Sequence, residues 1–422
     1  MKFYIYTLGC KVNAYESKVM QDKLISAGYK LGSCDDADIF IVNTCTVTNT
    51  SDNKSLKIVR HILREHPKSI TVVVGCMTQV NSNLLNELDV SIILGNKGKS
   101  GIVKYIEEYK NSKKKIVVID EKLEHKFEDM CLNNFNKTRA FVKIEDGCEN
   151  FCTYCIIPYA RGPVRSKKPE KVINEITSLV KNGHKEIVLT GIHTGHYGAD
   201  IKNSFSNLLK DIEKIDKLER LRISSIEITE LNEDFMDVLE NSNIIVDHLH
   251  IPLQSGSDVI LKLMNRKYDK EYFIKKIEEI RKIRPDISIT TDVIVGFPGE
   301  TEKLFNETID TIKKINFSKI HVFPFSLRNG TKAEELPNHI DSVTKKERCK
   351  KLIELSKQLE INYFNKFIDN KVSFVPEMYK DGYIVGHTGN YLSIKTKGSI
   401  EDLNKIKEVV IKRVDYPYCI GK

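Results

Sequence analysis

Short apolar runs alternate with amphipathic stretches along the first part of the chain. Five unbroken apolar runs, each about as long as a strand, lie at residues 2–9, 38–44, 70–75, 90–95 and 115–120. Unbroken apolar strands connected by helices are typical of a parallel sheet with both faces covered. The pattern therefore predicts a doubly wound α/β unit over residues 1–121.

The start of the first helix of this unit is indicated by side-chain chemistry. Asn13 can act as an N-cap, and Glu16 stands three residues later in the capping-box position. Gly28 is the kind of residue that ends a helix. A second helix is predicted at residues 52–65, because Pro67 stops it.

A second alternation of strands and helices begins after a polar, non-periodic stretch at residues 122–137, which we interpret as a linker. Six strand candidates lie at residues 139–145, 186–192, 220–227, 248–254, 287–297 and 319–326. Six βα repeats predict a partial (βα)6 TIM-like barrel over residues 138–370, which a long helix at 344–369 closes. The ligand site of such a barrel lies at the carboxyl ends of its strands.

The last part of the chain, residues 371–422, changes to a period of two around Gly, Asn and Asp turns. This pattern predicts a small antiparallel β-barrel. Tyr383 and Tyr391, with lysines nearby, are candidates for stacking on RNA bases. Packing inside a small core is the alternative for each tyrosine.

Composition places the chain among folded proteins, with 41% hydrophobic and 29% charged residues in 422. No apolar run approaches the roughly 18 residues that a membrane span needs, and the N-terminus does not resemble a signal peptide. We therefore expect a cytoplasmic protein with no membrane partner. The net charge of +8 divides into +4 for residues 1–137, +1 for 138–370 and +3 for 371–422, which weakly favours a polyanion such as nucleic acid.

Cysteines follow three neighbouring strands of the N-terminal unit at the point where each strand ends. They are Cys10, Cys45 and Cys76. The carboxyl ends of parallel strands share one edge of a sheet, so we expect the three thiols to lie close together as metal ligands. Three buried small hydrophobes are the alternative.

A second group of cysteines lies on a glycine-led loop after the first barrel strand: Cys148, Cys152 and Cys155. In a reducing compartment such clusters are more often metal sites than disulfides. Thiolates select zinc, copper(I) or iron–sulfur, and structural zinc needs four protein ligands. A fourth ligand could come only through the fold, from His184, His193 or His196. The other cysteines (Cys34, Cys131, Cys349 and Cys419) have no partner at ligand spacing and are interpreted as bystanders.

The spacing C-x3-C-x2-C, with Tyr154 before its last cysteine, resembles the radical S-adenosylmethionine superfamily. This resemblance implies a [4Fe-4S] cluster held by three cysteines, with one iron open to S-adenosylmethionine. The reduced cluster cleaves that cofactor to a radical, which removes a hydrogen atom from carbon. It also implies an electron donor, which the motif does not identify.

Further motifs resemble the methylthiotransferase family within that superfamily: TLGCKVNAYES, NTCTVTNTSD, VVVGCM, CENFCTYCIIPYARGPVRS, HIPLQSGSD and TTDVIVGFPGET. The resemblance implies a second [4Fe-4S] cluster on Cys10, Cys45 and Cys76. It also implies that a carbon–SCH3 group replaces a carbon–hydrogen bond, and that the C-terminal barrel is an RNA-binding TRAM module.

The loop sequence IPYARGPVRS is closest to the branch of the family that modifies N6-threonylcarbamoyladenosine at position 37, in the anticodon stem-loop of tRNA. The isopentenyladenosine branch usually has a GCQMN-like first motif. Alternatives are therefore that branch, or a ribosomal-protein aspartate as substrate. A distant alternative is a zinc-stapled RNA-binding protein without catalysis.

Residues at the ends of barrel strands are candidate contacts of S-adenosylmethionine: Tyr154, Gly191, Gln254 and Ser255. For Tyr154 and Gly191 the alternatives are a packing aromatic and a simple turn. Glu227 and Asp292 are acids in apolar strands, and a buried carboxylate needs a partner. Each is either a site residue or half of a salt bridge, and no catalytic residue is assigned.

Overall fold

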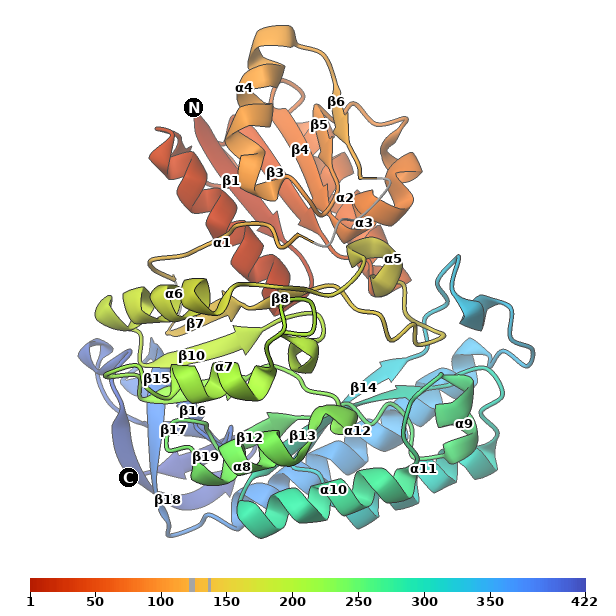
Figure 1. The fold of residues 1–422 in the computed structure, drawn as a ribbon, viewed down its shortest axis with the longest axis vertical. Helices are drawn as coiled ribbons and strands as arrows, with labels where there is room; N and C mark the ends of the chain where they lie inside the picture. The colour runs from red at the N-terminus through yellow and green to blue at the C-terminus, as the bar shows by residue number, and fades with distance from the viewer. Residues whose placement is uncertain (121–125, 136–137) are drawn as a thin grey trace.

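The structure is a computed structural model that describes residues 1–120, 126–135 and 138–422. Figure 1 shows an N-terminal unit in red and orange above a central unit in yellow, green and light blue, with a small dark-blue barrel at the C-terminal end. None of the described helices is long and apolar enough to cross a membrane.

The N-terminal unit is a six-stranded parallel sheet. In spatial order its strands are β2 (Lys30–Leu31), β1 (Lys2–Thr7), β3 (Ile39–Thr44), β4 (Ile70–Gly75), β5 (Ile92–Leu94) and β6 (Ile116–Val118). One face packs against α1 (Lys11–Ser26) and α4 (Ile102–Ser112), the other against α2 (Asn49–Glu65) and α3 (Cys76–Asn81). Successive strand residues point to opposite faces, so apolar side chains fill both layers, as the unbroken runs predict.

The first helix begins earlier than predicted. Helix α1 starts at Lys11 with Cys10 at the N-cap position, so the expectation that Asn13 caps it is wrong. The Asn13 amide instead donates to the carbonyls of Leu8 (2.7 Å) and Thr44 (2.9 Å) at the ends of two strands. Gly28 does follow the helix, with a left-handed φ of 88° that a glycine adopts freely.

The central unit contains two three-stranded parallel sheets with helices outside them. The strands are, in spatial order, β11 (Arg220–Ile223), β10 (Glu186–Thr190) and β7 (Arg139–Lys143), then β12 (His248–His250), β13 (Ser288–Val295) and β14 (Lys319–Pro324). A parallel bridge between Leu221 and Ile245 joins the two sheets. The helices of this unit are α6 (Pro169–Lys181), α7 (Phe205–Ile212), α8 (Glu233–Asn241), α9 (Asp258–Leu263), α10 (Lys270–Ile283) and α11 (Glu302–Ile315), and the predicted closing helix is α12 (Ser342–Asn365).

The predicted linker is only partly solvent-exposed. Residues 122–125 and 136–137 of it lie outside the described residues. In the described part, Met130, Leu132 and Phe135 are buried in the core of the central unit. The Leu132 N–H also donates to Glu175 at 2.7 Å. This segment therefore packs as part of the central unit.

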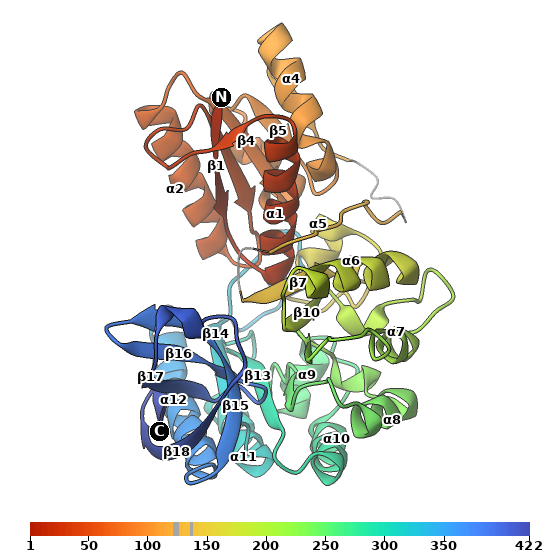
Figure 2. The same cartoon turned by 90° about the vertical axis from the view of Figure 1, so that its left-hand side faces the viewer.

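The C-terminal unit is a closed five-stranded barrel of β15 (Lys371–Lys380), β16 (Tyr383–Thr388), β17 (Ser393–Lys397), β19 (Tyr418–Gly421) and β18 (Lys407–Asp415). Its pairings are antiparallel except that of β17 with β19, which is parallel and corrects the all-antiparallel expectation. Phe364 and Phe367, at the end of α12, share its core. Figure 2 shows the barrel beside β13 and β14, below the N-terminal unit.

Candidate metal centres

The second group of cysteines lies on the loop between β8 (Glu145–Asp146) and α5 (Ile157–Arg161). The Cys155 N–H donates to the Cys152 carbonyl at 2.9 Å, which folds the loop into a tight turn. Burial, with a smaller contribution from the neighbouring Cys152, raises the pKa of Cys155 to about 12. Burial also raises the pKa of Cys148, to which Cys155 and Cys152 add. The three thiols therefore lie close enough to influence one another, in a site that is only partly exposed.

The first group comes together at the carboxyl edge of the N-terminal sheet. Cys10 caps α1, Cys45 follows β3, and Cys76 begins α3. Burial raises the pKa of Cys45 to about 11, with smaller contributions from Cys76 and Cys10. A Cβ on Gly9 would lie 2.7 Å from the Cys45 sulfur, so this position accepts only glycine while the thiol keeps its place.

The spacing of the thiols distinguishes between kinds of metal. A tetrahedral zinc site with Zn–S bonds of about 2.3 Å places its sulfurs about 3.8 Å apart. Two groups of three possible ligand atoms lie within 4.8 Å of one another in the described chain: His193–His196–Glu230 and His250–Asp292–His321. Neither group includes a cysteine. Each trio is thus more open than a zinc site, which fits a cluster whose thiolates bind different irons.

An arginine donates to one sulfur in each group. The Nε of Arg161 lies 3.3 Å from the Cys76 sulfur, and an Nη of Arg266 lies 3.3 Å from the Cys152 sulfur. Both guanidinium groups are buried, and both can offset the negative charge of thiolates and of a bound cluster. The two groups therefore have the same electrostatic arrangement.

Arg161 belongs to a buried ionic network between the N-terminal and central units. Glu16 accepts from Lys99 at 2.5 Å and from Lys143 and Arg161 at 2.7 Å each. Asp146 adds a second carboxylate, 2.7 Å from Lys143. Burial alone would raise the pKa of Glu16, but the three cations outweigh it and hold the pKa below its ordinary value of 4.5. The predicted capping role of Glu16 is thus replaced by charge pairing across the interface.

A cavity of about 190 Å³ lies between the two groups of cysteines. Its lining includes Val47 and Thr48, just after Cys45, and Tyr154 and Cys155 from the second loop. Gln254 also lines it, with a left-handed φ of 64° that is uncommon for a residue other than glycine. Such backbone strain is concentrated at ligand sites. The cavity is therefore a place where a molecule could contact Cys155 and the segment that follows Cys45.

Two predicted cofactor contacts have other roles in the structure. Ser255 lies outside the cavity lining, and its hydroxyl is 3.2 Å from that of Thr308 on α11. A Cβ on Gly191 would lie 2.7 Å from Glu145 Oε2, which accepts from the His193 N–H at 2.7 Å. A side chain at position 191 would crowd the Glu145 carboxyl, and the cofactor contacts expected of Gly191 and Ser255 stay predictions.

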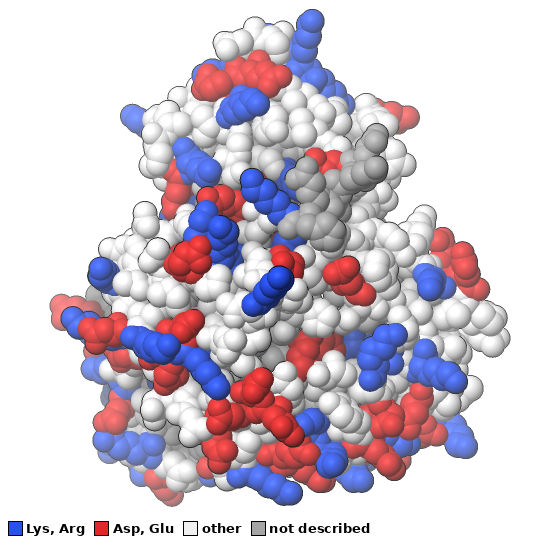
Figure 3. Space-filling view, viewed as in Figure 1, with Lys and Arg blue, Asp and Glu red and all other residues white. Residues whose placement is uncertain are grey.

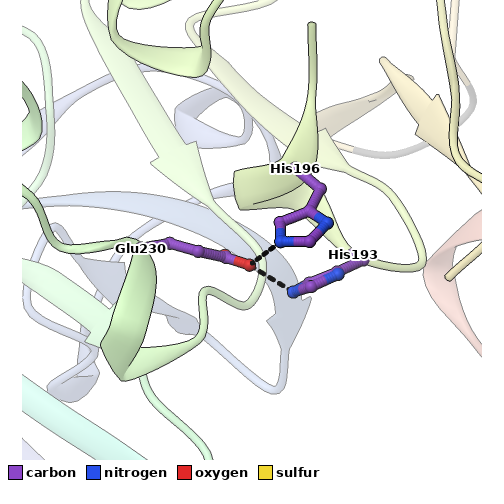
Figure 4. A group of neighbouring side chains, drawn as sticks. All are labelled: His193, His196 and Glu230. Atoms are coloured by element: carbon purple, nitrogen blue, oxygen red, sulfur yellow. Dashed lines mark ion pairs between the residues drawn. The ribbon is translucent and has the colours of Figure 1, made fainter. Parts of the chain in front are cut away.

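Two of the candidate histidines approach the second group of cysteines. Figure 4 shows His193 and His196, from the loop after β10, directed at Glu230. The Nδ1 of His193 lies 3.8 Å from the Cys148 sulfur, while its Nε2 forms the ion pair with Glu230. His193 is thus a close neighbour of the Cys148 thiol. Its ring is already engaged by the Glu230 carboxylate.

His184 does not join this site. It precedes β10, at the end of the strand opposite to the cysteine loop, and its Nε2 lies 3.1 Å from the Phe135 N–H. The possibility that His184 supplies a fourth ligand is therefore wrong.

The two acids that were expected in apolar strands have partners; Asp292 lies in β13, whereas Glu227 follows β11. Glu227 forms an ion pair with Arg266, which in turn donates to Cys152, so Glu227 orients an arginine of the metal site. Asp292 lines the cavity, and its Oδ1 is 3.3 Å from His250 Nε2. Each carboxylate therefore has a partner beside the cysteine loop or the cavity, and the assignment of either as a site residue stays a prediction.

The two tyrosines proposed to face RNA differ. The Tyr391 ring packs 4.0 Å from the Arg222 guanidinium and 4.4 Å from the His248 ring, between the C-terminal barrel and the central unit. The interpretation of Tyr391 as an RNA-stacking residue is therefore wrong. Tyr383 is 39% exposed, and the Lys395 ammonium lies 4.9 Å from its ring centroid, so it keeps a surface that RNA could reach.

Sequence reasoning missed Arg266 and Glu145. Arg266 is separated from Cys152 by 114 residues, and no local pattern connects them. Glu145 is buried beside the cysteine loop, burial raises its pKa well above the ordinary value, and its Oε1 has no hydrogen-bond partner among the described residues. The available signal was its position as an acid just before the glycine-led loop.

Two family models match the chain: Radical SAM superfamily at residues 142–312, and Uncharacterized protein family UPF0004 at residues 2–95. Among proteins of known name, the Bacillus subtilis threonylcarbamoyladenosine tRNA methylthiotransferase MtaB is 40% identical over 99% of this chain and 95% of its own length. The Thermotoga maritima protein of the same name is 37% identical over 94% of this chain and 95% of its own length.

A Clostridium botulinum tRNA-2-methylthio-N6-dimethylallyladenosine synthase is 33% identical over 97% of this chain and 94% of its length. Among solved structures, the radical S-adenosylmethionine methyltransferase TsrM from Kitasatospora setae gives a TM-score of 0.56 at 14% identity. The match covers 76% of this chain and 72% of that one, and it shows likeness of fold.

Proposed function

The chain belongs to the methylthiotransferase family of radical S-adenosylmethionine enzymes, and we propose that it converts N6-threonylcarbamoyladenosine at position 37 of tRNA to its 2-methylthio derivative. The observation that supports this proposal most directly is the full-length similarity to two relatives named threonylcarbamoyladenosine tRNA methylthiotransferase, at 40% and 37% identity. The relative named for the dimethylallyl substrate is 33% identical over a similar length. The resemblance seen in the motifs is thereby confirmed at the level of the family.

The radical S-adenosylmethionine domain uses that cofactor and a [4Fe-4S] cluster, and we propose a second cluster in the N-terminal unit. The ligands would be Cys148, Cys152 and Cys155 for one, and Cys10, Cys45 and Cys76 for the other. When bound, these groups supply the one-electron chemistry that exchanges the C2–H bond for C2–SCH3. Open trios with an arginine at one sulfur support this assignment.

The side chains of the protein position and shield the reaction in this proposal. Tyr154 and Gln254 line the cavity between the cysteine groups and would contact S-adenosylmethionine. Phe323 and Phe325 add an apolar wall that excludes water from a reactive carbon. Arg161 and Arg266 hold positive charge next to the sulfurs whatever the redox state.

We also interpret the two central sheets as one open six-stranded barrel, because the Leu221–Ile245 bridge and the Ile226 N–H to His250 carbonyl bond (3.0 Å) connect their edges. We propose domains at residues 1–121, 138–370 and 371–422; each has its own main hydrophobic cluster, and some side chains from neighbouring segments join these clusters. A chain with reduced thiols and a tRNA substrate is expected to work in the cytoplasm.

The anticodon stem-loop is the proposed RNA partner, with the C-terminal barrel as one contact. Figure 3 shows Lys, Arg, Asp and Glu interspersed on one face of the molecule, so the surplus of positive charge does not form a single patch there. Recognition on that face would therefore depend on specific contacts more than on a general basic field.

Nucleoside mass spectrometry tests the proposal. The anaerobically purified protein, with S-adenosylmethionine and a reductant, is incubated with one tRNA carrying N6-threonylcarbamoyladenosine and one carrying isopentenyladenosine. We expect the methylthio product only from the first. Product from the second tRNA alone, or none from either with clusters present, would overturn the proposed substrate.

A further inference from the structure

A second cavity, of about 330 Å³, lies where all three units of the protein meet. It is lined by Lys11 of the N-terminal unit, by Arg222, His248 and His321 of the central unit, and by Tyr391 of the C-terminal barrel. This three-unit pocket is rich in nitrogen donors, and aliphatic and aromatic side chains add apolar surface to its lining.

The three-unit pocket adjoins the cavity between the cysteine groups. Asp292 lines that cavity, and its carboxylate pairs with His250, which lines the three-unit pocket. Thr290 Oγ1 continues the connection, at 2.9 Å from His250 Nδ1 and 3.0 Å from His248 Nε2. The two cavities therefore share the wall that Asp292, His250 and Thr290 form.

Charge in the pocket is unevenly matched. Arg222 pairs with Glu186 at 2.7 Å, and Lys319 pairs with Glu360 at 2.9 Å. Lys11 is exposed and makes no ion pair or side-chain hydrogen bond with another described residue. Its ammonium is close enough to His321 and His248 to lower the pKa of each, after burial as the main cause. The pocket therefore has an unpaired cation aimed into it.

A second observation also indicates a missing ligand. His248 is 4% exposed, and its Nδ1 has no hydrogen-bond partner among the described residues. A buried ring nitrogen of this kind costs free energy unless a polar group reaches it. Because burial and Arg222 lower the pKa of His248 well below its ordinary value, the ring is neutral and can donate a hydrogen bond or accept one.

We propose that the three-unit pocket receives the threonylcarbamoyl group of the substrate, with the Lys11 ammonium pairing with its carboxylate and His248 Nδ1 bonding its polar atoms. This inference rests on the proposed function. In adenine, the N6 substituent and C2 belong to the same six-membered ring, so a base that presents C2 to the first cavity places its substituent next to that cavity. An anionic, hydroxyl-bearing group matches the Lys11 ammonium and the unpartnered His248 Nδ1 of the lining.

Binding of synthetic anticodon stem-loops tests this proposal. Three otherwise identical stem-loops carry at position 37 the threonylcarbamoyl group, its threonine carboxamide analogue, or unmodified adenosine. Fluorescence anisotropy with the cluster-loaded protein is expected to show the carboxylate form bound about tenfold tighter than the carboxamide, as loss of a charge-assisted contact implies. Lys11→Gln should erase that difference, and Lys11→Arg should keep most of it.

The matched control is Lys104→Gln, which removes the same charge from exposed α4 of the same unit. Iron content checks that the clusters next to Lys11 remain. Equal binding of carboxylate and carboxamide by the unaltered protein overturns the inference. So does an equal loss for all three stem-loops in Lys11→Gln, since this would indicate a phosphate contact. If the unaltered protein fails to methylthiolate the threonylcarbamoyl stem-loop, the proposed function itself fails.

Discussion

Replacing Glu16 by glutamine should destabilise the protein strongly, because this carboxylate neutralises three buried cations. In the native structure it lies 2.5 Å from Lys99 and 2.7 Å from both Lys143 and Arg161, with its side chain fully buried. Glutamine keeps the shape but removes the charge. Lys99 then keeps the Asn96 amide oxygen at 3.2 Å and loses its carboxylate.

The size of the effect follows from that arrangement. Removing one partner from a buried ion pair costs about 3–5 kcal/mol, because an uncompensated charge stays out of water. Asp146 still pairs with Lys143 and Arg161, so the stranded charge is mainly that of Lys99. We therefore expect a decrease of about 3–5 kcal/mol in the free energy of unfolding at pH 7.

Circular dichroism during urea unfolding measures this decrease, since the chain has no tryptophan to serve as a fluorescent probe. The control is Asp22→Asn on the same helix, which breaks the part-exposed pair with Lys18 and should cost about 0.3–0.5 kcal/mol. The double variant Glu16→Gln/Lys99→Met removes the stranded ammonium and should recover part of the loss. A loss for Glu16→Gln no larger than that of Asp22→Asn would refute the reasoning.

Acid should reduce the difference in unfolding free energy between the unaltered protein and Glu16→Gln. The pKa of Glu16 is depressed in the folded state from an ordinary value of 4.5. Its stabilisation is therefore complete above pH 4.5 and is lost as the pH falls toward the folded pKa. The gap in unfolding free energy between the unaltered protein and Glu16→Gln should be constant from pH 7 to 5 and decrease below 4.5. A gap that widens in acid would contradict the assignment of Glu16 as a buried carboxylate.

Three further outcomes are expected. Cys148→Ala should abolish formation of 5′-deoxyadenosine from S-adenosylmethionine. Cys45→Ala should keep that formation and stop methylthiolation. Methylthio product from Cys45→Ala would exclude the N-terminal site as the sulfur site. The Arg266→Gln protein should keep the iron content of the unaltered protein. In a redox titration the reduction potential of the cluster at Cys148, Cys152 and Cys155 should shift downward, because a positive donor at the Cys152 sulfur is lost. An unchanged potential would argue against a role of Arg266 in setting it. Lys395→Gln should weaken stem-loop binding and reduce the slope of log affinity against log salt by about 1, and an unchanged slope would place Lys395 away from the phosphates.

The strands of the fold could be predicted because burial leaves a local record. In β3 and β4 every residue is buried, and the sequence shows each as an unbroken apolar run next to a helix. The position of Cys45 and Cys76 just after these strands was equally readable, since parallel strands end at one edge. Local pattern and strand geometry together were enough to bring these thiols together.

Contacts between distant segments could not be predicted in the same way. Asn13 and Glu16 fit a capping signature, but capping competes with partners that local sequence does not show. Helix α1 begins at Lys11, which lets the Asn13 amide reach two strand-end carbonyls and the Glu16 carboxylate reach Lys143. Tyr391 likewise lies between arginines because the C-terminal barrel folds back on β11, an arrangement that its strand pattern does not encode.

The distance between the two cysteine groups is set by one short segment of the chain. Helix α5, Ile157–Arg161, directly follows the second group and is about 7.5 Å long at 1.5 Å per residue. Its last residue donates to the Cys76 sulfur, and the Ala160 carbonyl accepts from Asn96, which itself contacts Cys76. The loop that carries one set of ligands therefore also fixes the position of the other. With two clusters bound as proposed, this segment would hold them at a defined separation.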